Sequence, residues 1–337
     1  MYNISLITGD GIGPELSESV MNIINVISDR HDLKLSVQKL QAGDKALKET
    51  GKALPDETIN SIKKSDACLK APVGESAADV IVALRRMLDL YANIRPAKSY
   101  PNMPALYNDI DMVIVRENTE DLYTGTEFKV DGASIALRII SEKASKRIAK
   151  YAFETARHRA KQKKVTCVHK SNVMRMTDGL FSQMCNEIAQ DYTDISFEEM
   201  YVDACAMNLI RKPQDFDVIV TTNLFGDILS DESSQVVGGL GMAPAANIGD
   251  NFALFEPVHG AAFDIAGKQI ANPSSFILSV SMMLDWLAQK HNDEKCKSIG
   301  QRLEQTVYEV VKSGIKTQDI GGTHTTKQFT DEIASRL

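Results

Sequence analysis

Short apolar runs alternate with longer amphipathic stretches along most of this chain. The apolar runs predict strands at 4–8, 67–70, 112–115, 164–168, 195–201 and 217–221. Helical patterns separate most of these runs, and one begins at Pro14, where the missing N–H of proline costs no hydrogen bond. This alternation predicts an α/β fold with a substantial parallel sheet.

Two segments depart from this pattern. Residues 123–141 contain Gly125, Gly132 and alternating apolar positions, which predict a hairpin. A projecting hairpin needs a surface that covers it, and a second subunit would supply one. The apolar stretch 276–287 is interrupted by two serines and an aspartate. It therefore predicts a buried helix, and no run is long enough to span a membrane.

Bulk composition narrows the function classes. The 337 residues allow one large or two medium domains, and the net charge of −7 argues against nucleic-acid binding. Five scattered cysteines without a Cys-x-x-Cys pair predict reduced thiols rather than disulfides or zinc ligands. No basic and apolar leader is evident at the N-terminus. We therefore expect a cytoplasmic protein.

Three aspartates suggest a metal site. Asp203 closes the run Glu-Met-Tyr-Val-Asp, and Asp227 and Asp231 lie in Asn-Leu-Phe-Gly-Asp-Ile-Leu-Ser-Asp. Residues four apart share one face of a helix, so the last two carboxylates repel unless a cation lies between them. Hard oxygen ligands suit Mg²⁺ or Mn²⁺. The alternative is a solvated helix face, which the apolar neighbours disfavour.

Three arginines suit an anionic substrate. Arg85 and Arg95 lie in the segment 82–96, and Arg116 opens Arg-Glu-Asn-Thr-Glu-Asp-Leu-Tyr. The planar guanidinium matches a carboxylate bidentately. Each arginine taken singly is equally compatible with a surface charge, although Arg95 has apolar neighbours.

Two glycine-rich segments are candidates for cofactor binding. The first, Gly-Asp-Gly-Ile-Gly at 9–13, follows a strand and precedes a helix. Its spacing is not that of the G-x-G-x-x-G dinucleotide fingerprint, so we do not expect a Rossmann fold. It is either a close approach to a ligand or a tight turn. The second, at 255–267, is rich in glycine and alanine, so it can lie against a planar adenine.

Together these motifs resemble the β-decarboxylating dehydrogenases, the family of isocitrate, 3-isopropylmalate, homoisocitrate and tartrate dehydrogenases. The resemblance extends from Gly-Asp-Gly-Ile-Gly-Pro-Glu at 9–15 to Gly-Gly-Thr-His-Thr-Thr at 321–326. It implies a mixed sheet with helices on both faces. It also implies a discontinuous cofactor domain, 1–90 and 238–337, and an inserted domain, 91–237. The inserted domain would carry the dimerisation hairpin and helices of a homodimer or larger assembly.

The resemblance also implies roles for individual residues. Tyr123 would protonate carbon and Lys170 would act as general base, because neighbouring positive charge favours its neutral amine. Lys170 and Asp203 would reach the site from the neighbouring subunit, whereas His169 is interpreted as structural. Residues expected at the cofactor are Ile12, Asn172, Glu256, His259, Gly260, Asp264, Ile265 and Asn272.

The cofactor is expected to be NAD. A carboxylate at Asp264 can accept hydrogen bonds from both ribose hydroxyls and would repel the 2′-phosphate of NADP. Relatives that use NADP tend to carry Lys-Tyr where this chain has Asp264-Ile265. A capping role for Asp264 in a turn is the weaker interpretation.

Substrate choice is expected to depend on the segment after Ser76, which we predict to be a helix N-cap. Ile81 and Arg85 would share one face, so Ile81 would lie beside the C3 substituent of a substrate held by Arg85. An isopropyl group suits this place, whereas the third carboxylate of isocitrate does not, because Ile81 is apolar and Asp79 is near. Arg86 would point about 100° away from Arg85.

We therefore predict NAD-dependent oxidative decarboxylation of 3-isopropylmalate, a step of leucine biosynthesis. Isocitrate, homoisocitrate and tartrate remain alternatives, since the motifs at 116–123 and 168–174 look closer to isocitrate dehydrogenases. The alternative interpretation of Ile81 is core packing only. A non-catalytic regulatory subunit is disfavoured, because the chain keeps the full set of aspartate, lysine and tyrosine.

Overall fold

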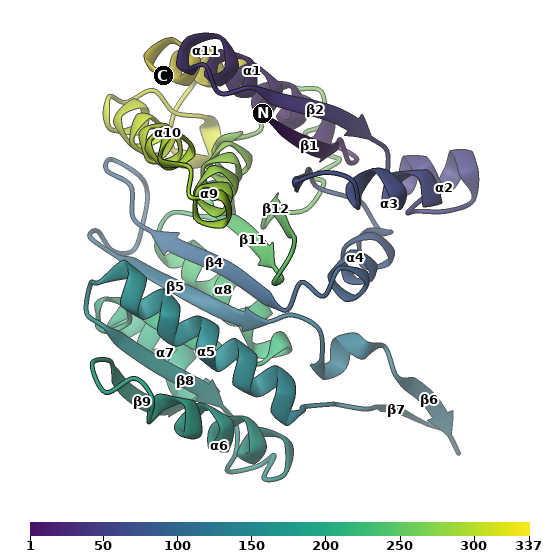
Figure 1. Ribbon diagram of the computed structural model, residues 1–337, viewed down its shortest axis with the longest axis vertical. Coiled ribbons are helices and arrows are strands. Elements are labelled where there is room, and N and C mark those ends of the chain that lie inside the picture. The colour runs from purple at the N-terminus through teal and green to yellow at the C-terminus, as the bar shows by residue number, and fades with distance from the viewer.

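One ten-stranded sheet runs through the molecule, with helices on both faces, in a computed structural model that describes residues 1–337 (Figure 1). The strands are β1 (Tyr2–Ile7), β2 (Leu35–Leu40), β3 (Ala67–Lys70), β4 (Ala92–Lys98), β5 (Asp111–Glu117), β8 (Lys164–His169), β9 (Ser196–Tyr201), β10 (Val218–Thr221), β11 (Pro244–Ile248) and β12 (Ala253–Pro257). Their order across the sheet is β2-β1-β3-β12-β11-β4-β5-β10-β8-β9.

The helices follow the strands in the alternation expected from the sequence. They are α1 (Gly13–His31), α2 (Asp44–Thr50), α3 (Asp56–Ile62), α4 (Ala83–Met87), α5 (Glu142–Arg159), α6 (Thr177–Ala189), α7 (Val202–Arg211), α8 (Asn223–Val236), α9 (Ser274–His291), α10 (Glu294–Lys312) and α11 (Thr326–Arg336). In Figure 1, α5 lies in front of β5 and α8 lies behind it. The prediction of an α/β fold with a mixed sheet is confirmed.

The two ends of the sheet are parallel and its centre is antiparallel. β1 pairs in parallel with β2 and β3, and β8 pairs in parallel with β9 and β10. β4 instead runs antiparallel to both β5 and β11, and β11 runs antiparallel to β12. Pro96 is accommodated because β4 pairs with β11 only as far as Ile94, so the missing N–H faces no ladder partner.

The first and last parts of the chain pack together. The Asn22 side chain donates to Asp331 at 3.2 Å, and Arg30 donates to the Ala334 carbonyl at 2.9 Å. Both termini lie at the top of Figure 1, among α1, α10 and α11. A discontinuous domain of 1–90 and 238–337 requires this closeness, although the division itself stays a prediction.

The predicted hairpin is confirmed. β6 (Glu127–Val130) and β7 (Ala133–Ala136) form a separate two-stranded sheet that projects from the body (Figure 1). Phe128 pairs with Ile135, and both side chains are exposed. The hairpin therefore buries none of its strand residues within its own chain.

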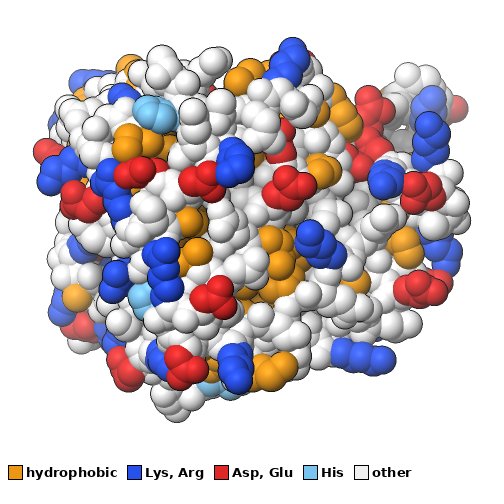
Figure 2. Space-filling view, turned by 90° about the horizontal axis from the view of Figure 1, so that it is seen from above, with side chains coloured by type: hydrophobic (Ala, Val, Ile, Leu, Met, Phe, Trp, Pro, Cys, Tyr) orange, Lys and Arg blue, Asp and Glu red, His pale blue; other side chains and the backbone are white.

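The apolar segment near 276–287 forms the middle of α9, which is the buried helix that the sequence predicts. None of the helices combines the length and apolar character needed to cross a bilayer. All five cysteines are buried and unpaired. On the face seen from above in Figure 2, positive and negative side chains are interspersed, without a broad basic patch.

Candidate active site

Three buried arginines converge on one region of the sheet. Arg95 lies on β4 and Arg116 on β5, where the antiparallel register places both on the same face, and Arg85 comes from α4. Their exposed fractions are 5% for Arg85, 7% for Arg95 and 1% for Arg116. Burial and the charge of Arg116 lower the pKa of Arg95 to about 10. A buried cluster of like charge is costly unless anions compensate it.

Asp227 on α8 supplies part of that compensation. Its carboxylate accepts hydrogen bonds from Arg116 and from the Tyr123 hydroxyl, and it lies 3.4 Å from Arg95 Nη2. Burial opposes ionisation of Asp227, but Arg116 and Arg95 outweigh it, so its pKa is lowered. Asp231, one helical turn further, pairs with Arg95 Nη1 at 3.3 Å through one oxygen only. The predicted shared face of the two aspartates is confirmed.

Gly226 allows this approach of helix to strand. A Cβ atom at Gly226 would lie 2.5 Å from Arg116 Cγ. Arg116 Nε donates to Asn223 at 2.9 Å, one turn earlier on α8. Arg116 Nη2 is buried and has no hydrogen-bond partner. A buried cationic donor without a partner is a costly feature, and a ligand anion would satisfy it.

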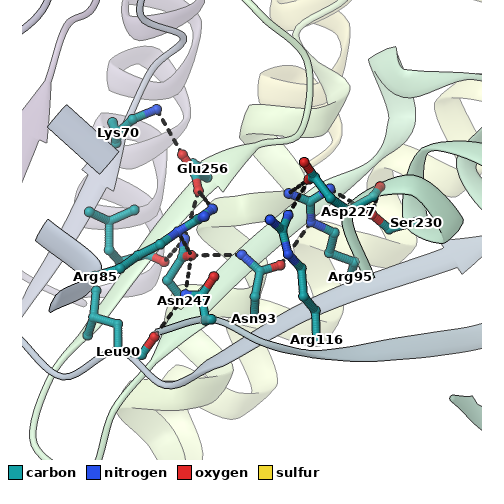
Figure 3. Close-up of polar contacts among 12 residues, drawn as sticks. Lys70, Arg85, Leu90, Asn93, Arg95, Arg116, Asp227, Ser230, Asn247 and Glu256 are labelled. Carbon is teal, nitrogen blue, oxygen red and sulfur yellow. Dashed lines mark hydrogen bonds and ion pairs between the residues drawn. The ribbon is translucent and has the colours of Figure 1, made fainter. Parts of the chain in front are cut away.

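A network of buried asparagine side chains surrounds Arg85, and these asparagines were not predicted from the sequence. The side-chain oxygen of Asn247 accepts from Arg85 Nε at 2.9 Å, from Asn93 at 2.7 Å and from Asn118 at 3.0 Å. The Asn247 amide nitrogen donates to Glu256 at 2.8 Å. Asn93 also accepts from Arg95 Nε at 2.8 Å, so it joins the two arginine groups (Figure 3).

Glu256 closes this network on the far side. It forms a buried ion pair with Lys70 at 2.8 Å and a longer one with Arg85 at 3.5 Å. Burial opposes ionisation of Glu256, but Lys70 and Arg85 lower its pKa to about 2. Glu256 was predicted at the cofactor, and the structure places it among the charges that hold Arg85. A cofactor contact stays a prediction.

The two candidate cofactor segments lie together. The Ile12 N–H donates to the Ala261 carbonyl at 2.8 Å, although the two residues are far apart in sequence. Gly9 and Gly11 have positive φ angles of 67° and 57°, and a Cβ at either would lie 2.0 Å from a carbonyl oxygen of Pro72 or Ala261. These glycines therefore serve a tight turn against the chain's own backbone.

The predicted cofactor residues differ in exposure. Asp264 and Gly260 are exposed, and the Asp264 side chain has no protein partner. Asn272 is buried between Asp319, to which it donates at 3.0 Å, and the Ser274 N–H. Burial lowers the pKa of His259. The remaining four are Ile12, which is buried, Ile265, which packs against the main core, Glu256, described above, and Asn172, which is exposed.

Lys170 and Asp203 stand apart from the arginines. The Lys170 ammonium contacts Asp203, and this hydrogen bond lowers the pKa of the carboxylate. Lys170 follows β8 and Asp203 begins α7, and neither side chain contacts the three arginines, Tyr123 or Asp227 within the chain. Asn172 follows Lys170 by two residues and forms no hydrogen bond to the 255–267 loop within the chain. His169 is buried and satisfied by Glu199 and the Ser171 N–H, as expected for a structural histidine.

The segment before Arg85 differs from the expected helix. Ser76 does not cap it: the Ser76 hydroxyl donates to Asp44 at 2.6 Å, and the cap position is Ala77, which forms no side-chain cap bond. Residues Ala78–Val82 form a π-helical turn. This geometry is rare in proteins, and where it occurs it is often at a functional site. The prediction of an N-cap at Ser76 is therefore wrong, because the Ser76 hydroxyl bonds to Asp44 and accepts no backbone N–H of the turn.

The expectation for Arg86 is confirmed. Arg85 is buried and Arg86 is exposed, so the two neighbouring arginines point in different directions. Ile81 is half-buried and packs against the apolar cluster that includes Val80 and Leu84. Its contact with a substrate stays a prediction.

Comparison with known proteins identifies the family. Residues 3–333 match the family model described as isocitrate/isopropylmalate dehydrogenase. The chain belongs to the isocitrate/isopropylmalate dehydrogenase family. Relatives named 3-isopropylmalate dehydrogenase are 54% identical in Saccharolobus solfataricus, over 98% of both chains, and 52% identical in Sulfurisphaera tokodaii, over 100% and 99%. The solved isocitrate dehydrogenase from Methylococcus capsulatus has a TM-score of 0.92 at 42% identity, covering 100% and 99%.

Family membership agrees with the resemblance on which the site was predicted. The structure joins into one cluster Arg85, Arg95, Arg116, Tyr123, Asp227 and Asp231, and it joins Lys170 and Asp203 into a separate pair. The supporting residues Lys70, Asn93, Asn118 and Asn247 escaped prediction, because a single asparagine or lysine carries no periodic signal.

Proposed function

We propose that this dehydrogenase catalyses the NAD-dependent oxidative decarboxylation of 3-isopropylmalate. The observation that carries the proposal is Arg116 Nη2, a buried and unpartnered donor beside Arg95 and Asp227. Three buried guanidiniums face two carboxylates there, so the arginines can accept a further anion. A substrate dicarboxylate matches this demand in both charge and hydrogen bonding.

The residues present fit a divalent metal and a nicotinamide dinucleotide. Asp227 and Asp231 offer hard oxygen ligands on one helix face, and one oxygen of Asp231 has no protein partner. Together with Asp203 they would hold Mg²⁺ or Mn²⁺, which supplies Lewis-acid polarisation. The exposed and unpartnered Asp264 beside the 9–13 turn suits the ribose hydroxyls of NAD⁺, the hydride acceptor.

The chain's own groups account for orientation and proton transfer. Arg85, Arg95 and Arg116 would fix the substrate carboxylates, and the buried network through Asn93 and Asn247 holds two of these arginines in place. Burial raises the pKa of Tyr123 although Arg116 opposes it. The phenol therefore keeps its proton at neutral pH and can deliver it to carbon. The Lys170 amine would take the proton of the substrate hydroxyl.

Lys170 and Asp203 would come from a second copy of the chain. Within one chain they meet each other and not the arginine cluster. Large apolar side chains are exposed on the helices that carry the aspartates: Met207 and Ile210 on α7 are 48% and 54% exposed, and Ile228 on α8 is 57% exposed. With the uncovered hairpin, these residues suit a homodimer interface. The unpaired cysteines suit a reducing cytoplasm.

The substrate assignment favours 3-isopropylmalate over isocitrate. The relatives at 54% and 52% identity bear the former name, whereas the isocitrate dehydrogenase structure is 42% identical. An apolar Ile81 agrees with the same choice. The test is NAD⁺ reduction with Mg²⁺ or Mn²⁺, measured side by side with isopropylmalate, isocitrate, homoisocitrate and tartrate. A highest kcat/KM on any substrate other than isopropylmalate would overturn the assignment.

Ile81→Asn should change the ratio between substrates. The variant loses apolar contact and buries an unpartnered amide, so kcat/KM for isopropylmalate should fall by about 1–3 kcal/mol, or about 10–200-fold. Isocitrate should gain relative to it, because the amide can donate to the third carboxylate. The matched control is Leu106→Asn, at an exposed aliphatic residue outside the hairpin and the arginine cluster. An unchanged ratio in Ile81→Asn would reduce Ile81 to core packing.

Replacing Asp264 and Ile265 with Lys and Tyr should move cofactor preference from NAD toward NADP. The lysine supplies a charge for the 2′-phosphate and removes the repulsion of a carboxylate. We expect a change of about 1–3 kcal/mol in the ratio of kcat/KM values for the two cofactors. Asp250→Asn, another exposed carboxylate, is the control. A wild-type protein that prefers NADP would contradict the NAD assignment.

A further inference from the structure

A roomy cavity lies on the face of the sheet opposite the arginines. Its volume is about 710 Å³, within the range of small-molecule sites, and its walls come from α5 on one side and α9 and α10 on the other. In Figure 1, α5 lies below β4 and β11, α9 and α10 lie above them, and α8 lies behind the sheet. We call this cavity the rear cleft.

The floor of the rear cleft is formed by the strands that carry the active site. Alternate residues of a strand face opposite sides of a sheet. On β4, Arg95 faces the arginine cluster, while Ile94 and Pro96 line the rear cleft. On β11, Asn247 faces the arginine cluster while Ala246 and Ile248 line the cleft. The rear cleft is therefore a separate site, back to back with the one described above.

Most charged groups around the rear cleft already have partners. Lys98 pairs with Glu304 at 2.6 Å, and Arg159 pairs with Asp111 at 2.9 Å. Lys161 contacts Asp111 as well. Glu154 accepts a hydrogen bond from Tyr192 at 2.6 Å. Because these groups are paired with one another, they do not require a charged ligand.

Asp285 on α9 has no such partner. Its carboxylate lines the rear cleft and forms neither a hydrogen bond nor an ion pair within the chain. Its Oδ1 lies over Gly300 of α10, where a Cβ would come within 2.7 Å, so the glycine leaves room for it. Burial, followed by the charge of Glu304, raises the pKa of Asp285 to about 7. An unpaired, half-buried carboxylate in a roomy cavity calls for a cationic partner.

The surroundings of Asp285 define the rest of such a partner. Trp286, Met282, Leu278 and Ile248 present apolar surface beside it. An aromatic ring next to a carboxylate also attracts a cation over its face, as the Lys290 ammonium already shows at 4.5 Å from the Trp286 ring. We propose that the rear cleft binds an organic cation with an apolar body, whose ammonium group pairs with Asp285.

The only tryptophan of the chain provides the readout, because Trp286 lines the cleft. The wild-type protein is titrated with phenethylammonium, with neutral 2-phenylethanol and with 3-phenylpropionate while tryptophan fluorescence is followed. We expect a saturable response to the ammonium and at least about tenfold weaker binding of the alcohol and the acid, since one charge-assisted bond is lost.

Asp285→Asn keeps the side-chain size and removes the charge, so it should weaken phenethylammonium binding by about tenfold or more. The control Glu294→Gln removes an exposed carboxylate of α10 outside the cleft and should bind as the wild type does. Thermal melting checks that both variants are folded. The proposal fails if phenethylammonium gives no saturable response, if the alcohol binds as tightly, or if Asp285→Asn retains full affinity. The wild-type comparison of the three probes decides the matter even if Asp285→Asn does not fold.

Discussion

Asp227→Asn is expected to lower kcat/KM for 3-isopropylmalate by about a thousandfold or more. The carboxylate meets Arg116, Arg95 and the Tyr123 hydroxyl at one point, and in the proposed function it also binds the metal. The variant would lose that ligand, and it leaves Arg116 without its anion and Arg95 with Asp231 alone. A loss of about 4 kcal/mol in transition-state stabilisation corresponds to that factor.

The measurement is steady-state kinetics at saturating Mg²⁺ or Mn²⁺, with the melting temperature as a check on folding. Asp191→Asn is the matched control, because this aspartate is exposed and its side chain has no partner. A folded Asp227→Asn enzyme that keeps kcat/KM within tenfold of wild type would show that Asp227 only balances the arginines.

Mixing inactive Lys170→Met chains with inactive Asp227→Asn chains should restore activity. If Lys170 acts on the partner's arginine cluster, each mixed dimer contains one site in which both residues are intact. Random exchange makes half of the dimers mixed, so about a quarter of wild-type activity should return, a gain of several hundredfold over either variant alone. The measurement is specific activity after unfolding and refolding of the mixture, with differently tagged chains to count mixed dimers.

The contact between Lys170 and Asp203 provides a matched control for this experiment. Because the two residues meet within one chain, they would be delivered to a site together. A mixture of Lys170→Met and Asp203→Asn chains should therefore stay inactive, since every site in the mixed dimer lacks one of the pair. Rescue in this control, or no rescue in the first mixture despite confirmed exchange, would refute catalysis across the subunits.

Sequence reasoning succeeded where a local pattern reflects a local structure. Buried parallel strands such as β3 and β10 are uninterrupted apolar runs, so they were found at nearly their observed bounds. The spacing of Asp227 and Asp231 is a property of any helix, so their shared face was predictable. The hairpin was predictable from its glycines and alternating apolar residues.

It failed where the structure depends on distant partners. β4 and β11 were missed, because Pro96 and Pro244 interrupt one strand and begin the other, and because Arg95 and Asn247 are polar in a buried sheet. These polar residues satisfy one another only after the strands pair, through contacts more than a hundred residues apart in sequence. For the same reason, the central position of Asn247 in the network could not be predicted from the sequence. Ser76 was misjudged because its acceptor, Asp44, lies in another element.

The exposed hairpin has a consequence for how assembly can be followed. Two antiparallel strands alone are barely stable in water, and all eight strand residues of β6 and β7 are exposed in the single chain. Their backbone hydrogen bonds therefore have no protection of their own, unlike those of the ten-stranded sheet. If the proposed dimer covers the hairpin, amide hydrogen exchange in this short segment reports on subunit association. Exchange should be fast in dilute solution and slower at concentrations where subunits associate, without substrate or cofactor being present.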